Sequence, residues 1–408
     1  MTRVVVTGLG CITPVGNNVA SFWAGITSGK HGFGSITKFD ASKLKAKIVG
    51  EVKDFNPEDY IEKSEIKRTD LYSQYAVAAA AQAVADSGIN GAVSEDRFGV
   101  YIGSGIGGLT TLVNQAEVMF AKGADRVSPF LVPMMIANIA SGLVAIKHNA
   151  RGVNLPVISA CATATHAIGE AFRAIKHGYA DAILAGGAEA SINPLGIGGF
   201  TTAMALSTSG DPDNASMPFD KRRHGFVMGE GAGVLVLEEY ERAIKRGAKI
   251  YCEISGYGNT CDAYHITAPH PEAEGTAKMM ELAFAEAGLS PDEKTYVNAH
   301  GTSTPLNDKA ETLAIKKVFG DAAYKIPISS TKSMVGHMLG AAGGVEAIAA
   351  IKAIETGIVP PTANYKEPDP DCDLDYIPNV ARECGINKAF STSLGFGGHN
   401  AGVLFSKL

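Results

Sequence analysis

Three side chains with catalytic chemistry each follow a short apolar run that predicts a strand. Cys161 lies between such a run, residues 155–158, and a run of small residues, 162–174, that favours a helix. We expect 155–158 to be a short buried strand, and a tight turn at 159–160 to present Cys161 to the free N–H groups at the helix start. That position predicts a lowered pKa for the thiol and a nucleophile near neutral pH. Alone, the cysteine is more simply interpreted as a small core residue.

Two histidines lie in comparable places in the second part of the chain. His300 and His337 each come just past another predicted strand, Lys332 lies in the turn before His337, and Phe396 lies in a glycine-rich loop between the last two strands. Each alone is more often structural, but the carboxyl ends of strands in a layered α/β fold gather at one crevice. A cysteine with two histidines suits acyl-thioester chemistry, with covalent capture of an acyl group and hydrogen-bond stabilisation of an oxyanion or enolate.

A weak internal repeat indicates how these residues are positioned. Two Ala-rich predicted helices end at Gly88 and Gly288, and each is followed by an acidic turn, a strand and a Gly/Ser/Thr loop. A repeat of this size predicts duplication of a whole α/β half rather than a solenoid. We therefore expect two halves, residues 1–250 with the cysteine and residues 251–408 with the two histidines.

Composition excludes several classes of protein. The chain has 408 residues, 46% of them hydrophobic, and a net charge of −6, so no overall basic surface predicts nucleic-acid binding. No apolar run approaches the roughly 18 residues of a membrane span, and the N-terminus enters a strand without a basic, then apolar, leader. The six cysteines form no Cys-x-x-Cys pair, so neither a zinc site nor a disulfide framework is expected. We expect a cytoplasmic protein.

The segment Gly103-Ser-Gly-Ile-Gly-Gly108 formally matches the dinucleotide-binding pattern Gly-x-Gly-x-x-Gly after a strand. It does not open the first β-α-β unit of the chain, and no acidic residue ends a second strand about 20 residues later, as that fold requires. Close backbone packing is therefore the preferred interpretation.

Four motifs in order resemble the β-ketoacyl-acyl-carrier-protein synthases, the condensing enzymes of fatty-acid synthesis. They are the Cys161 segment, Asn298-Ala-His300-Gly-Thr-Ser-Thr, Thr331-Lys332-Ser-Met-Val-Gly-His337 and Gly395-Phe396-Gly-Gly-His-Asn. The resemblance spans the whole chain and is greatest to the type II branch. It implies a thiolase-like duplicated five-layer α-β-α-β-α sandwich, a homodimer and an acyltransferase that condenses an acyl-enzyme with malonyl carrier protein, lengthening the acyl chain by two carbons.

The resemblance also implies residue roles. Cys161 would be the nucleophile, His300 and His337 would stabilise the enolate as neutral donors, and the backbone N–H groups of Cys161 and Phe396 would form a second oxyanion hole, with Phe396 gating access. Lys332 would complete the catalytic set by supporting the histidines electrostatically, and the supporting residues would be Glu346 and Asp308. The substrate-binding residues would be Thr302 and Thr304 for the pantetheine arm, Ile106 and Phe200 for the acyl chain, and His265.

Acyl and malonyl carrier proteins are the partners that the resemblance implies, and no organic cofactor is required. Candidate basic contacts for an acidic carrier are Lys63, Lys67, Arg68 and Arg126, and a Na⁺ or K⁺ ion is expected near Asn298, Glu346 and Ser391. Two positions depart from the family pattern: His399 stands where enteric members have Thr, and Met204 where some relatives have Arg.

Alternatives remain open. A type I synthase or a polyketide ketosynthase shares the Cys-His-His set. A non-condensing chain-length partner subunit lacks the nucleophile, so Cys161 counts against it. A thiolase uses a second cysteine, which the Phe396 loop does not offer. A Cys-His hydrolase is the least favoured, because no Asp or Asn is evidently placed to orient a histidine base.

Overall fold

The computed structural model describes residues 2–408, and one mixed β-sheet runs through this part of the chain. Its strands stand in the order β4-β5-β6-β1-β7-β13-β12-β8-β9. Their bounds are β1 (Val4–Ile12), β4 (Phe98–Gly103), β5 (Ala182–Glu189), β6 (Gly231–Glu239), β7 (Cys252–Cys261), β8 (Thr295–Asn298), β9 (Ile328–Ser329), β12 (Lys388–Gly395) and β13 (His399–Ser406). Two short pairs lie outside it, β2 (Gly34–Ser35) with β3 (Ile48–Val49) and β10 (Ile358–Val359) with β11 (Arg382–Glu383).

The two halves of this sheet repeat one topology. The extended residues around Asn154 bond to Val100 and so extend the first half beyond β4. From that edge inward, the first half reads Asn154 segment-β4-β5-β6-β1, and the second half reads β9-β8-β12-β13-β7. If the strands of each half are numbered along the chain, both halves have the order third, second, fourth, fifth, first. In each half the fifth strand, β6 or β13, is antiparallel to both neighbours, and the other pairs are parallel. The duplication predicted from the sequence is confirmed.

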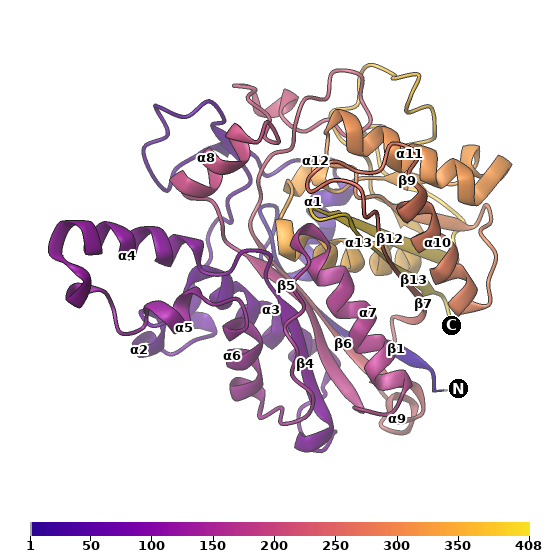
Figure 1. The fold of residues 1–408 in the computed structure, drawn as a ribbon. Coiled ribbons are helices and arrows are strands. Elements are labelled where there is room, and N and C mark those ends of the chain that lie inside the picture. Colours follow the sequence, from indigo (N-terminus) through magenta and orange to yellow (C-terminus); the bar gives the residue numbers. More distant parts are fainter. Residues whose placement is uncertain (1) are drawn as a thin grey trace.

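The helices form three layers around the two half-sheets. α3 and α6 cover the outer face of the first half, and α10 and α11 cover that of the second. α7 and α13 contact strands of both halves and form the middle layer, seen between the indigo-to-magenta and orange-to-yellow halves in Figure 1. The predicted five-layer α-β-α-β-α architecture is therefore present. The helix bounds are α1 (Val19–Thr27), α2 (Lys63–Ile66), α3 (Leu71–Ser87), α4 (Leu109–Lys122), α5 (Leu131–Met135), α6 (Ile139–His148), α7 (Thr163–Lys176), α8 (Pro194–Thr202), α9 (Tyr240–Lys245), α10 (Glu274–Ala287), α11 (Pro305–Phe319), α12 (Lys332–Val335) and α13 (Ala342–Thr356).

Local sequence explains the outer and middle helices. α3 and α10 end at Gly88 and Gly288, which adopt nearly the same left-handed conformation, with φ of 60° and 64°. Glycine takes this conformation without steric cost and closes the helix. α7 and α13 are buried along most of their length, because sheets cover both of their faces, although α7 keeps Glu170, Arg173 and Lys176 on a partly exposed side. Among the described residues, no helix has the length and apolar character needed to cross a membrane.

The prediction of a buried strand at 155–158 is wrong. Outside a single bridge at Asn154 the segment is irregular, and Leu155 and Ile158 are 48% and 55% exposed. The segment lies at the outer edge of the sheet, where only β4 adjoins it. It passes so close to β4 that a Cβ on Gly103 would lie 2.0 Å from the Val157 carbonyl oxygen. The glycines at 103–108 thus serve backbone packing, as preferred above.

The chain passes from the first half to the second between β6 and β7, but β1 and β7 are hydrogen-bonded through Val4–Val6, so the sheet is continuous there. The boundary at residue 250 stays a prediction.

Candidate active site

Cys161 lies in a 3₁₀ turn, η4 (Ala160–Ala162), directly before α7. Ala160 adopts a left-handed φ of 51°, which is uncommon for a residue with a Cβ. The Thr163 hydroxyl accepts a hydrogen bond from the Ser159 N–H at 2.9 Å and closes the turn. The thiol therefore lies at the start of the middle-layer helix, and Cys161 is only 8% exposed.

The electrostatics of Cys161 differ from the prediction. Burial raises the pKa of the thiol to about 12, although the Lys332 charge and the backbone N–H of Phe396 favour the thiolate. The predicted lowering of this pKa is wrong, because the loss of water around the sulfur outweighs the groups that favour the thiolate. Cys161 rests as a thiol, and its proton must leave when the sulfur attacks.

The two histidines come from separate loops of the second half. Glu311 on α11 accepts hydrogen bonds from the N–H groups of His300 and Gly301 at 2.7 and 2.8 Å, which fixes the turn after β8. The N–H of His337 donates to the Val227 carbonyl at 2.7 Å, between α12 and the 3₁₀ turn η7 (Leu339–Ala341). The imidazole centroids are 5.2 Å apart and the rings are nearly perpendicular, at 88°.

Lys332 and Glu346 determine how His300 is protonated. The Lys332 ammonium donates to His300 Nδ1 at 3.3 Å and pairs with the Glu346 carboxylate, and all three residues are buried. An ammonium has no acceptor, so Nδ1 must accept and Nε2 must carry the proton. Burial lowers the pKa of both His300 and His337 well below the usual value, and the nearby Lys332 charge adds to this. Both imidazoles are neutral at pH 7.

These groups share one cavity of about 340 Å³. Phe396 is 36% exposed, and its ring lies 6.2 Å from that of Phe200, which also lines the cavity. Thr302 and Thr304 line the same cavity, with their hydroxyl oxygens 2.8 Å apart. The predicted residues that the structure brings together here are Cys161, Phe200, His300, Thr302, Thr304, His337 and Phe396, with Lys332 and Glu346 behind His300.

Two predicted substrate-binding residues do not line this cavity. His265 is exposed, and its Nδ1 accepts hydrogen bonds from the N–H groups of Thr267 and Ala268 in its own loop. Ile106 is 38% exposed and is not among the residues that line the cavity. Met204 lines the cavity yet is 87% exposed, so it lies at the entrance.

The remaining predicted residues do not line the cavity. The candidate docking residues Lys63, Lys67, Arg68 and Arg126 are all exposed. The Arg68 guanidinium lies over the Phe130 ring, 5.1 Å from its centroid, which brings it beside α5. Asp308 is fully buried at the first turn of α11 and accepts the Phe219 N–H at 2.8 Å, so it stabilises a loop rather than facing the histidines. His399, the departure noted above, lies 6.1 Å from the His166 ring.

The suspected cation position contains unpaired oxygen atoms. Asn298 and Ser391 are register partners on adjacent strands, β8 and β12, and α13, which carries Glu346, packs on both strands. Asn298 Oδ1, Ser391 Oγ and Glu346 Oε2 are buried without a hydrogen-bond partner within residues 2–408. Amide, hydroxyl and carboxylate oxygens are the donors that hard cations prefer, so these residues fit a Na⁺ or K⁺ ion.

Sequence reasoning missed two buried carboxylates. Glu311 anchors His300, and Glu189 accepts the N–H groups of Gly105 and Gly340 at 2.8 and 3.1 Å, joining the loop after β4 to the turn after His337. Burial raises the pKa of each to about 7. Glu311 shares a helical stripe with Ile315 and Phe319, and an acidic residue on an apolar stripe is the pattern that could have revealed it. Glu189 offers no comparable pattern.

Comparison with known proteins agrees with this geometry. The chain matches the family model described as beta-ketoacyl synthase, N-terminal domain, over residues 1–243, and the corresponding C-terminal domain over 251–366. It is 52% identical over 407 residues to the 3-oxoacyl-[acyl-carrier-protein] synthase 2 of Synechocystis sp., covering 99% of this chain and 98% of that protein. It is 48% identical over 408 residues to the protein of the same name from Coxiella burnetii, covering 100% of this chain and 99% of that one.

Solved structures give the same result. A beta-ketoacyl synthase from Burkholderia phymatum superposes with a TM-score of 0.92 at 35% identity and covers both chains fully. The ishigamide ketosynthase/chain length factor superposes with a TM-score of 0.92 at 37% identity, covering 100% of this chain and 99% of that one. A type II polyketide ketosynthase in complex with its acyl-carrier protein superposes with a TM-score of 0.91 at 36% identity, covering 100% of this chain and 99% of that one. Matched from end to end in sequence and fold, this chain belongs to the β-ketoacyl synthase family.

Proposed function

We propose that this protein is an acyltransferase that lengthens carrier-bound fatty acyl chains by decarboxylative condensation with a malonyl thioester. One observation carries the proposal: Cys161, His300, His337 and the Phe396 loop line a single cavity. A thiol can hold an acyl group, and two neutral imidazoles can stabilise an enolate without donating a full proton. Neither task requires a histidine to act as a general base.

In the first step, Cys161 Sγ attacks the carbonyl carbon of an acyl thioester. The N–H groups of Cys161 and Phe396 are the proposed donors to the oxyanion, and the Phe396 N–H also favours the Cys161 thiolate. The C–S bond to the carrier arm breaks, and the leaving thiolate takes the proton that Cys161 loses. This proton transfer agrees with the raised pKa of Cys161, because the buried cavity disfavours a thiolate. Passing the proton from Cys161 to the departing sulfur leaves no charged thiolate in the cavity.

In the second step, a malonyl thioester binds with its carbonyl oxygen against the Nε2–H of His300 and the ring of His337. Its C–C bond to the carboxylate breaks, carbon dioxide leaves, and the electron pair forms an enolate. The enolate carbon attacks the acyl-Cys161 carbonyl, the C–S bond breaks, and the released Cys161 thiolate takes a proton from solvent water. Lys332 supports this step by fixing the His300 tautomer.

Fatty-acid elongation is preferred over polyketide synthesis on sequence similarity. The relatives at 48–52% identity carry the name 3-oxoacyl-[acyl-carrier-protein] synthase 2, whereas the polyketide ketosynthases match at 36–37%. A carrier protein is the proposed partner, because one such structural neighbour was solved with its acyl-carrier protein. All six cysteines are free, which fits the reducing cytoplasm that we propose as its compartment.

Intact mass spectrometry tests the condensation. The protein is mixed with an acyl carrier protein, and malonyl carrier protein is added afterwards. We expect an acyl adduct on Cys161 that disappears when the malonyl donor is added, together with a β-ketoacyl product. An adduct that only hydrolyses would indicate a thioesterase-like enzyme, and no adduct on the folded protein would indicate a non-condensing partner subunit.

We also propose that Asn298, Glu346 and Ser391 hold a Na⁺ or K⁺ ion that neutralises the second oxygen of Glu346. The support is their three unpaired buried oxygens. Potassium chloride should raise the melting temperature above that in choline chloride at equal ionic strength, and Ser391→Ala should reduce this difference. Sodium chloride is compared in the same way, and equal melting temperatures of the wild type in all three salts would reject the ion.

We propose a homodimer formed at the outer edge of the first half-sheet. Leu155 and Ile158 are exposed there, in the segment that follows the bridge at Asn154 and lies beside β4. An exposed sheet edge with large apolar side chains favours pairing with another chain. Sedimentation equilibrium should give the dimer mass, Leu155→Glu should weaken association, and a monomeric wild type at micromolar concentration would refute the proposal.

A further inference from the structure

One side of the cavity is a continuous piece of backbone, which we call the 302–307 wall. Thr302, Thr304, Pro305, Leu306 and Asn307 all line the cavity. The wall includes Ser303, whose φ of 69° lies in the left-handed region. A serine rarely adopts this conformation unless its surroundings hold it there. The shape of the wall therefore depends on groups behind it.

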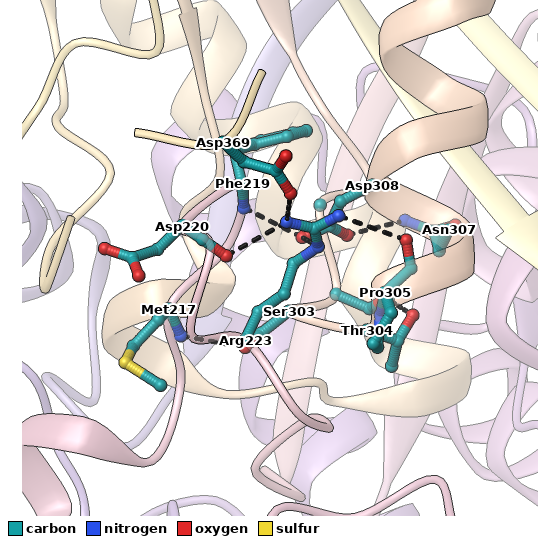
Figure 2. A network of polar contacts seen from close by, with 12 residues as sticks. Met217, Phe219, Asp220, Arg223, Ser303, Thr304, Pro305, Asn307, Asp308 and Asp369 are labelled. Carbon is teal, nitrogen blue, oxygen red and sulfur yellow. Dashed lines mark hydrogen bonds and ion pairs between the residues drawn. The ribbon is translucent and has the colours of Figure 1, made fainter. Parts of the chain in front are cut away.

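A second loop, residues 217–225, lies behind the wall and holds it. The Met217 N–H donates to Ser303 Oγ at 2.9 Å, and the Gly225 N–H donates to the Ser303 carbonyl at 2.9 Å. Both contacts are to the residue with the unfavourable φ. Figure 2 shows Met217 against Ser303, with Arg223 in the middle of the surrounding network.

Arg223 joins this loop to the wall and to a third segment. Its guanidinium donates to the Pro305 carbonyl at 3.2 Å, to the Asp220 carbonyl at 3.0 Å and to Asp369 Oδ2 at 2.5 Å. Its Nε lies 3.8 Å from Asp308 Oδ2. The Arg223 side chain is 5% exposed and does not line the cavity, so it acts from behind Pro305, as Figure 2 shows.

Arg223 also acts on the wall through Asp308. That carboxylate is fully buried and accepts the Phe219 N–H at 2.8 Å and the side-chain N–H of Asn307, a residue of the wall, at 3.1 Å. Burial raises the pKa of Asp308, and the Arg223 charge opposes that rise. Without the guanidinium, Asp308 would gain a proton more readily and hold the Asn307 amide less firmly.

We propose that Arg223 is a positioning residue that fixes the 302–307 wall in the shape that binds the pantetheine arm of the substrate. This inference rests on the proposed function, since the arm must pass Thr302 and Thr304 to bring its thioester to Cys161. The arm is an extended chain of amides, which needs hydroxyl and backbone partners at fixed positions. Loss of Arg223 should therefore weaken binding of the arm much more than it slows the chemistry at Cys161.

Acylation of Cys161 by octanoyl-pantetheine tests the inference, with kcat and KM measured separately and alkylation by iodoacetamide as a reagent without the arm. Arg223→Met should raise KM at least about tenfold, because it removes hydrogen bonds from a charged group, while kcat and the alkylation rate change by less than about threefold. Arg223→Lys keeps the charge beside Asp308 and should recover part of the KM. Arg222→Met is the matched control, because Arg222 pairs with Asp220 and makes no contact with the wall.

Each outcome separates the alternatives. An unchanged KM in folded Arg223→Met overturns the inference, and so does a fall in kcat and alkylation at constant KM, which indicates a purely structural role. If Arg223→Met does not fold, the variant Asp369→Asn is used instead, because this change removes the charged partner of Arg223 and leaves the guanidinium in place. Asp369→Asn should raise KM about threefold, and an unchanged KM overturns the inference. If the wild type is not acylated by octanoyl-pantetheine or by acyl carrier protein, the proposed function fails first.

Discussion

The buried pair of Lys332 and Glu346 offers the sharpest test of how the enolate is stabilised. In Lys332→Met, His300 Nδ1 loses its donor, so nothing holds the proton on Nε2 or keeps that N–H directed into the cavity. Loss of one aimed donor to a developing oxyanion costs about 3 kcal/mol, which corresponds to a ~100-fold slower reaction. We expect malonyl-thioester decarboxylation to fall by this factor while acylation of Cys161 continues.

Stability must be separated from catalysis in this experiment. Lys332→Met leaves Glu346 buried without its charged partner, and breaking such a pair costs about 3–5 kcal/mol. The double variant Lys332→Met/Glu346→Gln removes both charges and should recover most of the lost stability, yet its decarboxylation should stay slow because His300 still lacks its donor. Melting temperatures measure the stability of each variant, and release of labelled carbon dioxide measures its rate of decarboxylation.

One result would refute the reasoning. If the folded double variant decarboxylates a malonyl thioester within about threefold of the wild-type rate, the Lys332–His300 contact does not set the barrier. His337, which has no contact with Lys332 comparable to that of His300, would then be the main donor.

Three further predictions concern buried titratable groups. Alkylation of Cys161 by iodoacetamide should rise about tenfold per pH unit between pH ~7 and ~9, because burial raises the pKa of this thiol to about 12; a plateau near pH 7 would mean a stabilised thiolate. Cys161→Gln should lose acyl transfer and keep decarboxylation, since both histidines remain; loss of both activities in a folded protein would contradict this division. Burial raises the pKa of Glu311 from 4.5 to about 7, so the folded state keeps a proton that the unfolded chain releases, and between these pH values the free energy of unfolding should fall by ~3 kcal/mol more in wild type than in Glu311→Gln. Urea unfolding at several pH values measures that difference, and parallel pH profiles would argue against it.

The sequence predicts well which reactive residues share the cavity. Cys161, His300 and His337 could be identified because a reactive residue after an apolar run is a local pattern, although only His300 directly follows a strand, β8, whereas Cys161 and His337 lie in the turns before α7 and α13. The matching helix ends at Gly88 and Gly288 are local in the same sense.

The sequence predicts poorly where a property depends on distant segments. The pKa of Cys161 depends on how much of the chain covers the sulfur, and the exposure of Leu155 depends on which strand stands at the sheet edge. Glu189 and Arg223 act through backbone groups far along the chain, so nothing near them in the sequence marks their roles.

The repeated strand order has a consequence for how the protein can evolve. If the two halves were separate, identical chains encoded by one gene, every substitution would appear in both, so a cysteine gained in one half would also be gained in the other. Once both halves are encoded in a single gene, each copy can mutate alone. In this chain one copy carries the cysteine in the 3₁₀ turn before its middle-layer helix α7, and the other carries a histidine just before the 3₁₀ turn that leads into α13. Two successive reactions can therefore share one cavity while selection acts on each half separately.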